Sequence, residues 1–324
     1  MKYIDLFAGI GGFHYGIDRC NRRVAETSDN KKGQHKSNHN SSNGSGRRSD
    51  TYTCVYSNEW DKYANSVYRK HFGECDSRDI RTVDARTLPD FDLLCGGFPC
   101  QSFSIAGKRR GFDDTRGTLF FEIARILKEK QPRLCLLENV KGLLSHDEGR
   151  TIKVIFATLD ELGYDLQWQV CNSKDFGVPQ NRERIFIVGH LRGTPRPKVF
   201  PIIGYDKKDT QPGEEICATV KSRYPSDWNG NYVSRTPLKF LTRNQKNIEG
   251  DYAFTVDGAN TGGIKQDMKI RRLTPIECER LQGFPDNWTQ YGADGELISD
   301  TQRYKMCGNA VTTNVITEIA KRLV

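Results

Sequence analysis

The sequence predicts an α/β protein with a doubly wound, mostly parallel sheet and a second, smaller domain rich in loops and short β segments. Between residues 3 and 193, short apolar runs alternate with segments of helical periodicity, which is typical of a parallel sheet covered by helices on both faces. This alternation stops at residues 194–197, and Pro, Gly, Asn and Arg prevail through about residue 272. At 324 residues, the chain also exceeds the usual size of one core.

The positive charge is concentrated in two parts of the chain. The net charge is +8, and residues 191–272 contain fifteen Lys and Arg against nine Asp and Glu. Residues 21–50 contain seven basic and three acidic residues, so the remainder sums to −2. A local basic excess is expected of a protein that grips a polyanion with one part and performs another task with the rest.

The ten cysteines do not predict disulfides or a metal site. We find no signal peptide, no apolar run long enough to span a membrane and no Cys/His spacing typical of metal ligands. We therefore expect thiols in a reducing, cytoplasmic compartment and no bound metal. Cys95, Cys135 and Cys171 lie within apolar runs and are predicted core residues.

The first segment reads as a strand, a glycine-rich turn and the start of a helix. Phe7, Gly9, Gly11 and Gly12 form the turn, and glycines there would admit a nucleotide-like ligand beside the helix N-terminus. A simple tight connection is the alternative.

Residues 21–50 are predicted to be a flexible surface insertion, because residues 26–50 contain no hydrophobic side chain. A nucleic-acid contact through its basic pairs is the alternative. Without the insertion, Glu59 lies 17 positions after Gly12, close to the spacing of a ribose-binding acid. Trp60 could stack on a purine or pack in the core, and Asp79 and Ile80 could contact an adenine amino group.

The remaining elements follow in order. We expect helices over 61–71, 117–130, 151–163 and 314–323, a capped helix starting at 274–277, and strands over 52–56, 91–95, 134–137, 166–170 and 185–188. In the loop-rich part we expect short β segments over 217–220 and 252–256.

Cys100 is the predicted nucleophile. It follows an apolar strand, two glycines and Pro99, at the type of strand end where open α/β sheets bind ligands. The loop after it carries Lys108 and Arg109 between glycines, which indicates either a lid over an anionic substrate or a solvated loop.

Glu138 and two arginines, Arg182 and Arg184, lie at other predicted strand ends and could converge on Cys100. A carboxylic acid can hold a pyrimidine N3 and an arginine can hold a carbonyl oxygen. The combination indicates nucleophilic addition to a pyrimidine ring beside a nucleoside-bearing donor.

The chain resembles the C5-cytosine DNA methyltransferases of the bacterial restriction-modification type. The Pro99-Cys100-Gln101 and Glu138-Asn139-Val140 triplets in this order are highly specific to that family. All matching segments occur in the family's order, namely 5–13, 55–64, 97–101, 116–121, 138–141, 180–184, 272–285 and 308–311.

The resemblance implies a role for each matching residue. Cys100 would attack C6 of a flipped cytosine, Glu138 would engage N3 and the amino group, Arg184 would contact O2, and Arg182 would support the loop and phosphate geometry. The implied cofactor is S-adenosylmethionine, released as S-adenosylhomocysteine. Its implied contacts are Phe7, Gly9, Gly11, Gly12, Glu59, Trp60, Asp79, Ile80, Pro99, Leu119 and Asn309, and the implied loop and DNA contacts are Gln101, Ser104, Lys108, Arg109 and Thr255.

The resemblance also implies a Rossmann-like catalytic domain over 1–193 plus about 302–324, a target-recognition domain over 194–272 and a hinge over 273–301. Thr255 and Thr219 both fit a Thr-Val pair that the family keeps in the recognition domain. The implied partners are double-stranded DNA and a separately acting restriction endonuclease. We expect a cytoplasmic, nucleoid-associated bacterial monomer.

Two rival functions remain. One branch of the family acts on tRNA, but its Cys-Phe-Thr element does not occur in this sequence. A catalytically inactive DNA-binding paralogue is the other rival, and the presence of Cys100, Glu138 and Arg184 together argues against it.

Overall fold

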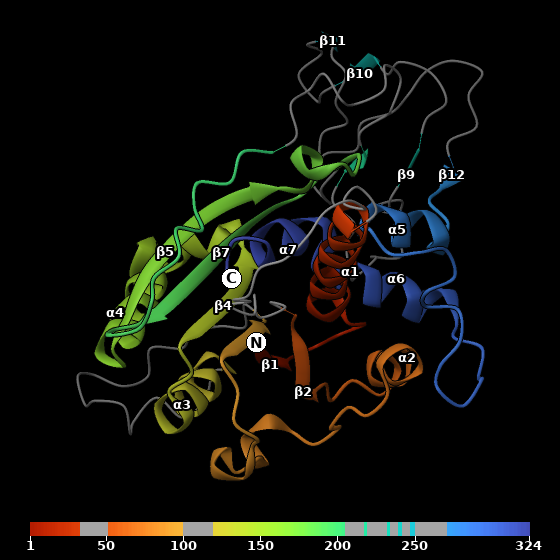
Figure 1. Ribbon diagram of the computed structural model, residues 1–324. Coiled ribbons are helices and arrows are strands. Elements are labelled where there is room, and N and C mark those ends of the chain that lie inside the picture. The colour runs from red at the N-terminus through yellow and green to blue at the C-terminus, as the bar shows by residue number, and fades with distance from the viewer. Residues whose placement is uncertain are drawn as a thin grey trace.

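The central element of the fold is a six-stranded sheet with the order β2-β1-β3-β4-β7-β5 (Figure 1). The structure is a computed structural model that describes residues 1–32, 51–99, 119–204 and 271–324, together with four short strands between 217 and 249. Side chains are described for 1–22, 51–99, 119–204 and 273–324. The strands of the sheet are β1 (Lys2–Leu6), β2 (Thr53–Asn58), β3 (Leu93–Gly97), β4 (Leu134–Val140), β5 (Tyr164–Asn172) and β7 (Glu183–Leu191).

Most of the sheet is parallel, as the sequence predicts. β1 pairs in parallel with β2 and β3, and β3 pairs in parallel with β4. β7 lies between β4 and β5 and is antiparallel to both. The one reversed strand matters for the site, because it brings the start of β7 to the edge where the parallel strands end.

Helices cover both faces of the sheet, because successive side chains of each strand point to opposite sides. Leu134 and Leu136 of β4 face a core cluster with α1 and α7, whereas Cys135 and Leu137 face a cluster with α3 and α4. Figure 1 shows α1 beside α7, away from α3 and α4. The helices are α1 (Gly12–Lys32), α2 (Lys62–Phe72), α3 (Leu119–Lys130), α4 (Arg150–Glu161), α5 (Pro275–Leu281), α6 (Asp300–Asn309) and α7 (Thr313–Ala320).

The predicted helices and strands exist, with shifted ends. Cys95, Cys135 and Cys171 are buried as expected. α5 starts with the expected capping box, in which Thr274 and Glu277 exchange hydrogen bonds. The helix α6 was not predicted from the sequence, because its apolar residues do not recur at helical spacing.

α1 extends through residues 21–32, the first part of the expected insertion. Residues 33–50 lie outside the described part of the chain. The two sides of this segment meet at a pair of hydrogen bonds: Asn21 Nδ2 donates to the Tyr52 carbonyl at 3.0 Å, and the Tyr52 N–H donates to Asn21 Oδ1 at 2.9 Å. Tyr52 is buried and its hydroxyl donates to the Ala320 carbonyl at 2.6 Å.

The segment from 273 to 309, expected in part to be a hinge, packs against α1 and α2 through a third core cluster. Trp288 stacks on His71 with ring centroids 3.5 Å apart, and its Nε1 donates to the Ile10 carbonyl. Lys305 Nζ lies 2.6 Å from Asp61 Oδ2. These contacts tie α5 and α6 to the part of the sheet edge formed by β1 and β2.

Within residues 205–270, the structure describes only short strands. β10 (Lys239–Leu241) and β11 (Asn247–Glu249) are antiparallel, as are β9 (Tyr232–Val233) and β12 (Arg271–Arg272). β8 (Cys217–Ala218) is parallel to β6 (Gln180–Asn181). The expected strand over 252–256 lies outside the described residues.

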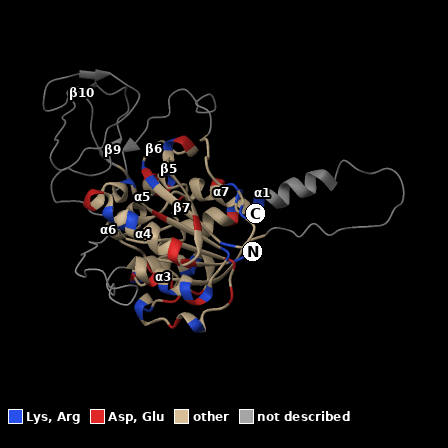
Figure 2. Cartoon of the chain, turned by 90° about the vertical axis from the view of Figure 1, so that its left-hand side faces the viewer, with Lys and Arg blue, Asp and Glu red and all other residues tan. Residues whose placement is uncertain are grey.

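Figure 2 marks the positions of basic and acidic residues along the chain, and in the described part the two kinds are interspersed. This distribution agrees with the near-neutral sum outside the two basic segments. In the described ranges, no helix is both long and apolar enough to cross a membrane.

Candidate active site

The candidate site lies along the edge of the sheet where β1, β2, β3 and β4 end. The carboxyl ends of parallel strands share one edge and line one crevice. β7 runs the other way, so its first residues, Glu183 and Arg184, reach the same edge opposite the last residues of β4. Arg184 therefore arrives at the start of a strand rather than after the end of one.

Glu138 and Arg184 form an ion pair within this edge. Arg184 Nε lies 3.1 Å from Glu138 Oε1, and the two side chains are only 16% and 12% exposed. Burial raises the pKa of Glu138, while Arg184 and Arg182 oppose that rise. A carboxyl with a raised pKa is closer to taking up a proton at neutral pH than an ordinary glutamate is. Such a group can donate a hydrogen bond to a ring nitrogen.

The end of β3 lies next to the Glu138–Arg184 pair. A Cβ on Gly97 would lie in ordinary van der Waals contact, 3.4 Å from Glu138 Oε2 and 3.5 Å from the Phe13 ring, so the end of β3 lies directly beside the carboxylate. The buried Asn139 side chain donates to the Phe98 carbonyl at 2.9 Å. Pro99 follows and is exposed. These contacts hold the chain directly before position 100.

The nucleophile prediction falls on an undescribed position. Cys100 lies outside the described residues, as do Gln101, Ser104, Lys108, Arg109 and Thr255. Their roles stay predictions from the sequence. Leu119, the other predicted residue next to this segment, is the half-buried first residue of α3.

The glycine-rich turn after β1 brings backbone donors to Glu59. Glu59 is 8% exposed, and its two carboxylate oxygens accept the Gly9 N–H at 2.9 Å and the Asp61 N–H at 2.7 Å. Burial raises the pKa of Glu59, and these two N–H donors oppose the rise. Each oxygen keeps acceptor capacity for a further donor, such as a ribose hydroxyl.

The conformation of the turn explains its residues. Phe7, Gly9 and Gly11 have φ of 56°, 56° and 86°, a region in which a non-glycine residue such as Phe7 is uncommon and which marks a strained turn. A Cβ on Gly12 would lie 2.6 Å from Val311 Cγ1. The turn is therefore packed closely against the segment that carries Asn309.

Trp60 follows Glu59 and is 66% exposed. Its indole does not fill the core, which removes the core-packing alternative and leaves a large aromatic face at the site. An exposed tryptophan beside a buried acid suits stacking on a purine base.

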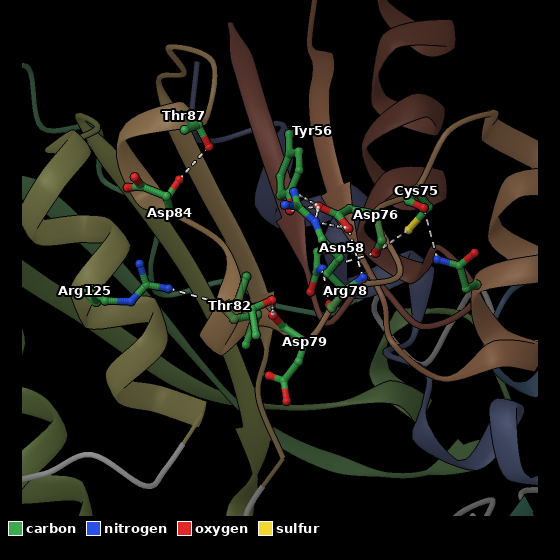
Figure 3. Close-up of polar contacts among 12 residues, drawn as sticks. Tyr56, Asn58, Cys75, Asp76, Arg78, Asp79, Thr82, Asp84, Thr87 and Arg125 are labelled. Atoms are coloured by element: carbon green, nitrogen blue, oxygen red, sulfur yellow. Dashed lines mark hydrogen bonds and ion pairs between the residues drawn. The ribbon is translucent and has the colours of Figure 1, made fainter.

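Asn58 holds the segment that leads into Asp79 at the end of β2, as Figure 3 shows. The buried Asn58 side chain donates to the carbonyls of Asp76 and Arg78 at 3.2 and 2.9 Å. The Glu59 N–H also donates to the Asp76 carbonyl at 2.9 Å. Ile80 is buried, and the Asp79 side chain is 26% exposed.

Arg182 is a buried residue that hydrogen-bonds the backbone at the end of α6. It is 1% exposed, and Nη2 donates to the carbonyls of Gly308 and Ala310 at 2.9 Å each. The exposed residue between those two carbonyls is Asn309, a predicted cofactor contact. The role predicted for Arg182, support of the loop and phosphate geometry, stays a prediction, and these two hydrogen bonds of its side chain go to the segment that carries Asn309.

Several residues that position the site are not predicted from the sequence. Asn58, Asp61, Asn139 and Lys305 act through the contacts given above. Asn58 and Asn139 lie inside segments that the resemblance covers, so a short polar residue at a strand end was the available signal. Lys305 gave no such signal, because its partner Asp61 is 244 positions away.

The arrangement suits a nucleoside-bearing cofactor. Glu59 is bonded to the positive-φ glycine turn and precedes the exposed Trp60. Glu138 and Arg184 lie further along the same sheet edge. In the ranges whose side chains are described, His, Cys, Asp and Glu do not gather in threes as a metal site would require.

Comparison with known proteins gives one family. A family model described as C-5 cytosine-specific DNA methylase matches residues 1–253 and 198–324. The type II methyltransferase M.HhaI of Haemophilus parahaemolyticus is 36% identical over 340 aligned residues, covering 99% of this chain and 93% of that protein. M.SsoII of Shigella sonnei is 39% identical, covering 100% of this chain and 80% of that protein.

Solved structures share the fold. The Dnmt2 methyltransferase of S. pombe has a TM-score of 0.66 at 18% identity and covers 98% of this chain and 96% of its own. A prophage-encoded DNA modification methyltransferase from E. coli, described as putative, has a TM-score of 0.59 at 19% identity, with coverage of 100% and 98%.

Proposed function

The chain belongs to the C-5 cytosine-specific DNA methylase family and is a DNA (cytosine-5)-methyltransferase, and we propose that it acts on a flipped cytosine through a covalent bond from Cys100 to C6. The buried Glu138–Arg184 pair is the observation that supports this proposal most directly. It combines a carboxyl whose pKa is raised by burial with a guanidinium beside it, next to the strand end that leads to Cys100.

Each residue then has one task. The Cys100 thiolate forms a bond to C6, while Glu138 hydrogen-bonds N3 and so draws electrons from the ring. Arg184 holds O2 and keeps Glu138 oriented. After C5 has been methylated, loss of the C5 proton to a base and release of the Cys100 sulfur from C6 restore the aromatic ring and the thiolate. The cytosine must leave the duplex first, because C6 cannot be reached inside the stack.

The cofactor side of the edge fits S-adenosylmethionine, which supplies the methyl group when bound. Glu59 would hold the ribose hydroxyls, Trp60 would stack on the adenine, and Asp79 with Ile80 would meet its amino group. Phe7, Gly9, Gly11, Gly12, Pro99, Leu119 and Asn309 would line the rest, with no metal required.

We also propose that residues 194–272 form the target-recognition domain for duplex DNA, supported by their basic excess. The relatives named type II methyltransferases support action beside a separate restriction endonuclease. A monomer in the bacterial cytoplasm is the corresponding expectation.

The test is methyl transfer from labelled S-adenosylmethionine into duplex DNA and tRNA. We expect label in DNA, none for Cys100→Ser, and DNA and cofactor binding by that variant close to wild type. Label only in tRNA, or normal methylation by Cys100→Ser, would contradict the proposal. Bisulfite sequencing of DNA from expressing cells would read the target sequence.

A further inference from the structure

Two consecutive turns between β2 and β3 share the pattern Asp-x-Arg-Thr, beginning at Asp79 and Asp84 (Figure 3). In both, the aspartate accepts the backbone N–H of the arginine two positions later at 3.0 Å. In both, the arginine Nε donates to the same carboxylate at 3.0 Å. Thr82 and Thr87 close the turns by donating to the aspartate carbonyls at 2.8 Å.

Only the first turn adjoins the cofactor edge. Asp79 directly follows Arg78, whose carbonyl is bonded by Asn58 at the end of β2. Asp84 lies five residues further along, and its carboxylate is 44% exposed against 26% for Asp79. The chain therefore contains the same Asp–Arg unit twice, once beside the proposed adenine position and once away from it.

We propose that Arg81 is a positioning residue that fixes the Asp79 carboxylate as the acceptor for the 6-amino group of the cofactor's adenine, an inference that rests on the proposed cofactor site. Arg81 Nη2 lies 2.5 Å from Asp79 Oδ2, and its Nε bonds both oxygens at 3.0 Å. A bidentate guanidinium sets the plane of a carboxylate. Both oxygens keep lone pairs for an outside donor.

The charge of Arg81 supports the same role. An aspartate is already ionised at neutral pH, and hydrogen bonds from the Arg81 side chain hold the pKa of Asp79 below its usual value. An ionised carboxylate is an acceptor only, which selects a ligand with an amino group over one without it.

The backbone of this turn is held from the other side by α3. Arg125 Nη2 donates to the Ile80 carbonyl at 3.0 Å, and Arg125 Nε donates to Glu122 at 2.8 Å. Ile80 is itself buried in the core cluster beneath α3. With the backbone fixed in this way, loss of Arg81 changes the freedom of the Asp79 side chain rather than the position of the turn.

The experiment compares Arg81→Gln with its internal control Arg86→Gln, using calorimetric binding of two ligands. One ligand is S-adenosylhomocysteine, and the other is its 6-desamino analogue, which carries purine in place of adenine. We expect wild type and Arg86→Gln to prefer the adenine ligand by roughly tenfold, because the analogue cannot donate a hydrogen bond to the ionised Asp79 carboxylate.

For Arg81→Gln we expect that preference to fall by roughly three- to fivefold, in the range of an exposed ion pair. Its affinity for the desamino analogue should stay unchanged. Two results would overturn the inference. An undiminished preference in Arg81→Gln would show that Arg81 does not position Asp79. An equal loss of affinity for both ligands would show that the variant loosens the binding site in general.

If the wild-type enzyme bound both ligands equally well, Asp79 would not accept a hydrogen bond from the 6-amino group, and the inference would be overturned. Methyl transfer to cytosine is measured separately, with Cys100→Ser as the blank, so such a result stays distinct from failure of the proposed function. Thermal unfolding of both variants, each changed at an exposed arginine, should match wild type.

Discussion

Arg184 Nε lies 3.1 Å from Glu138 Oε1 across two antiparallel neighbours of an otherwise parallel sheet. The reversal of β7 makes this contact possible, because a sixth parallel strand would present its last residues at the edge instead. The pair is nearly buried, so its geometry is fixed before a substrate enters. Preorganised charge of this kind is the main source of transition-state stabilisation in many enzymes.

Replacement of Glu138 by Gln should reduce methyl transfer by about 100-fold or more, the usual contribution of a positioned acid or base. The amide cannot transfer a proton to N3, whereas the cofactor contacts remain. The measurement is single-turnover methyl incorporation together with binding of S-adenosylhomocysteine. The matched control is Glu183→Gln at an exposed neighbour that pairs with Lys141 at 2.9 Å; equal loss in both variants would contradict the assignment.

Replacement of Trp60 by Ala should weaken S-adenosylhomocysteine binding roughly tenfold, the order of one base–aromatic stack. Folding stability should change little, since the indole is 66% exposed. Trp168→Ala, at a 48% exposed tryptophan of β5, is the control and should bind normally. If Trp60→Ala kept full affinity, Trp60 would not be the stacking residue.

Replacement of Arg182 by Met should lower the free energy of unfolding by about 2 kcal/mol or more, because two buried carbonyls lose their donors. Urea unfolding measures this change. Binding of S-adenosylhomocysteine to the folded variant should also weaken, because Asn309 lies between those two carbonyls. Arg192→Met, at a surface arginine paired with Asp165 at 3.1 Å, should leave both properties unchanged.

Asp5 gives a prediction for pH. It is fully buried in β1, and neither carboxylate oxygen has a hydrogen-bond partner among the described residues. Burial first, and then nearby Glu59, raise its pKa well above the usual value. The folded state therefore binds the proton more tightly than the unfolded state, so the Asp5 contribution to stability falls as pH rises from about 4 through the folded pKa.

The variant Asp5→Asn removes this titration. We expect the urea midpoint of Asp5→Asn to rise relative to the wild-type midpoint as pH increases from 4 to 8. The exposed-site control Asp90→Asn should show no such gain. A constant difference between Asp5→Asn and wild type across this range would show that Asp5 does not titrate as described.

Much of the fold could be predicted from local patterns. The capping box at Thr274 and the apolar runs of β3 and β4 depend on residues close in sequence, and the structure confirms them. The ends of the strands could not be predicted from local patterns alone. β4 continues through Glu138 and Asn139, because pairing with β7 supplies partners for polar residues that break an apolar pattern.

The remainder depends on contacts between distant residues. Neither the antiparallel direction of β7 nor the ion pair between Lys305 and Asp61 leaves a periodic signal. The Arg81 turn was readable as a repeated Asp-x-Arg-Thr, but its nearness to the cofactor edge follows only from the bonds of Asn58.

The paired hydrogen bonds between Asn21 and Tyr52 have a consequence for engineering and for evolution. These two residues flank the segment that begins with the last turns of α1. Because they are bonded to each other, the sequence between them can lengthen or shorten without moving β1 or β2, at an entropic cost that grows only slowly with length. The hydrogen-bonded pair fixes the two ends of this segment next to each other. A reporter domain inserted in this segment should leave the sheet and the candidate active site intact.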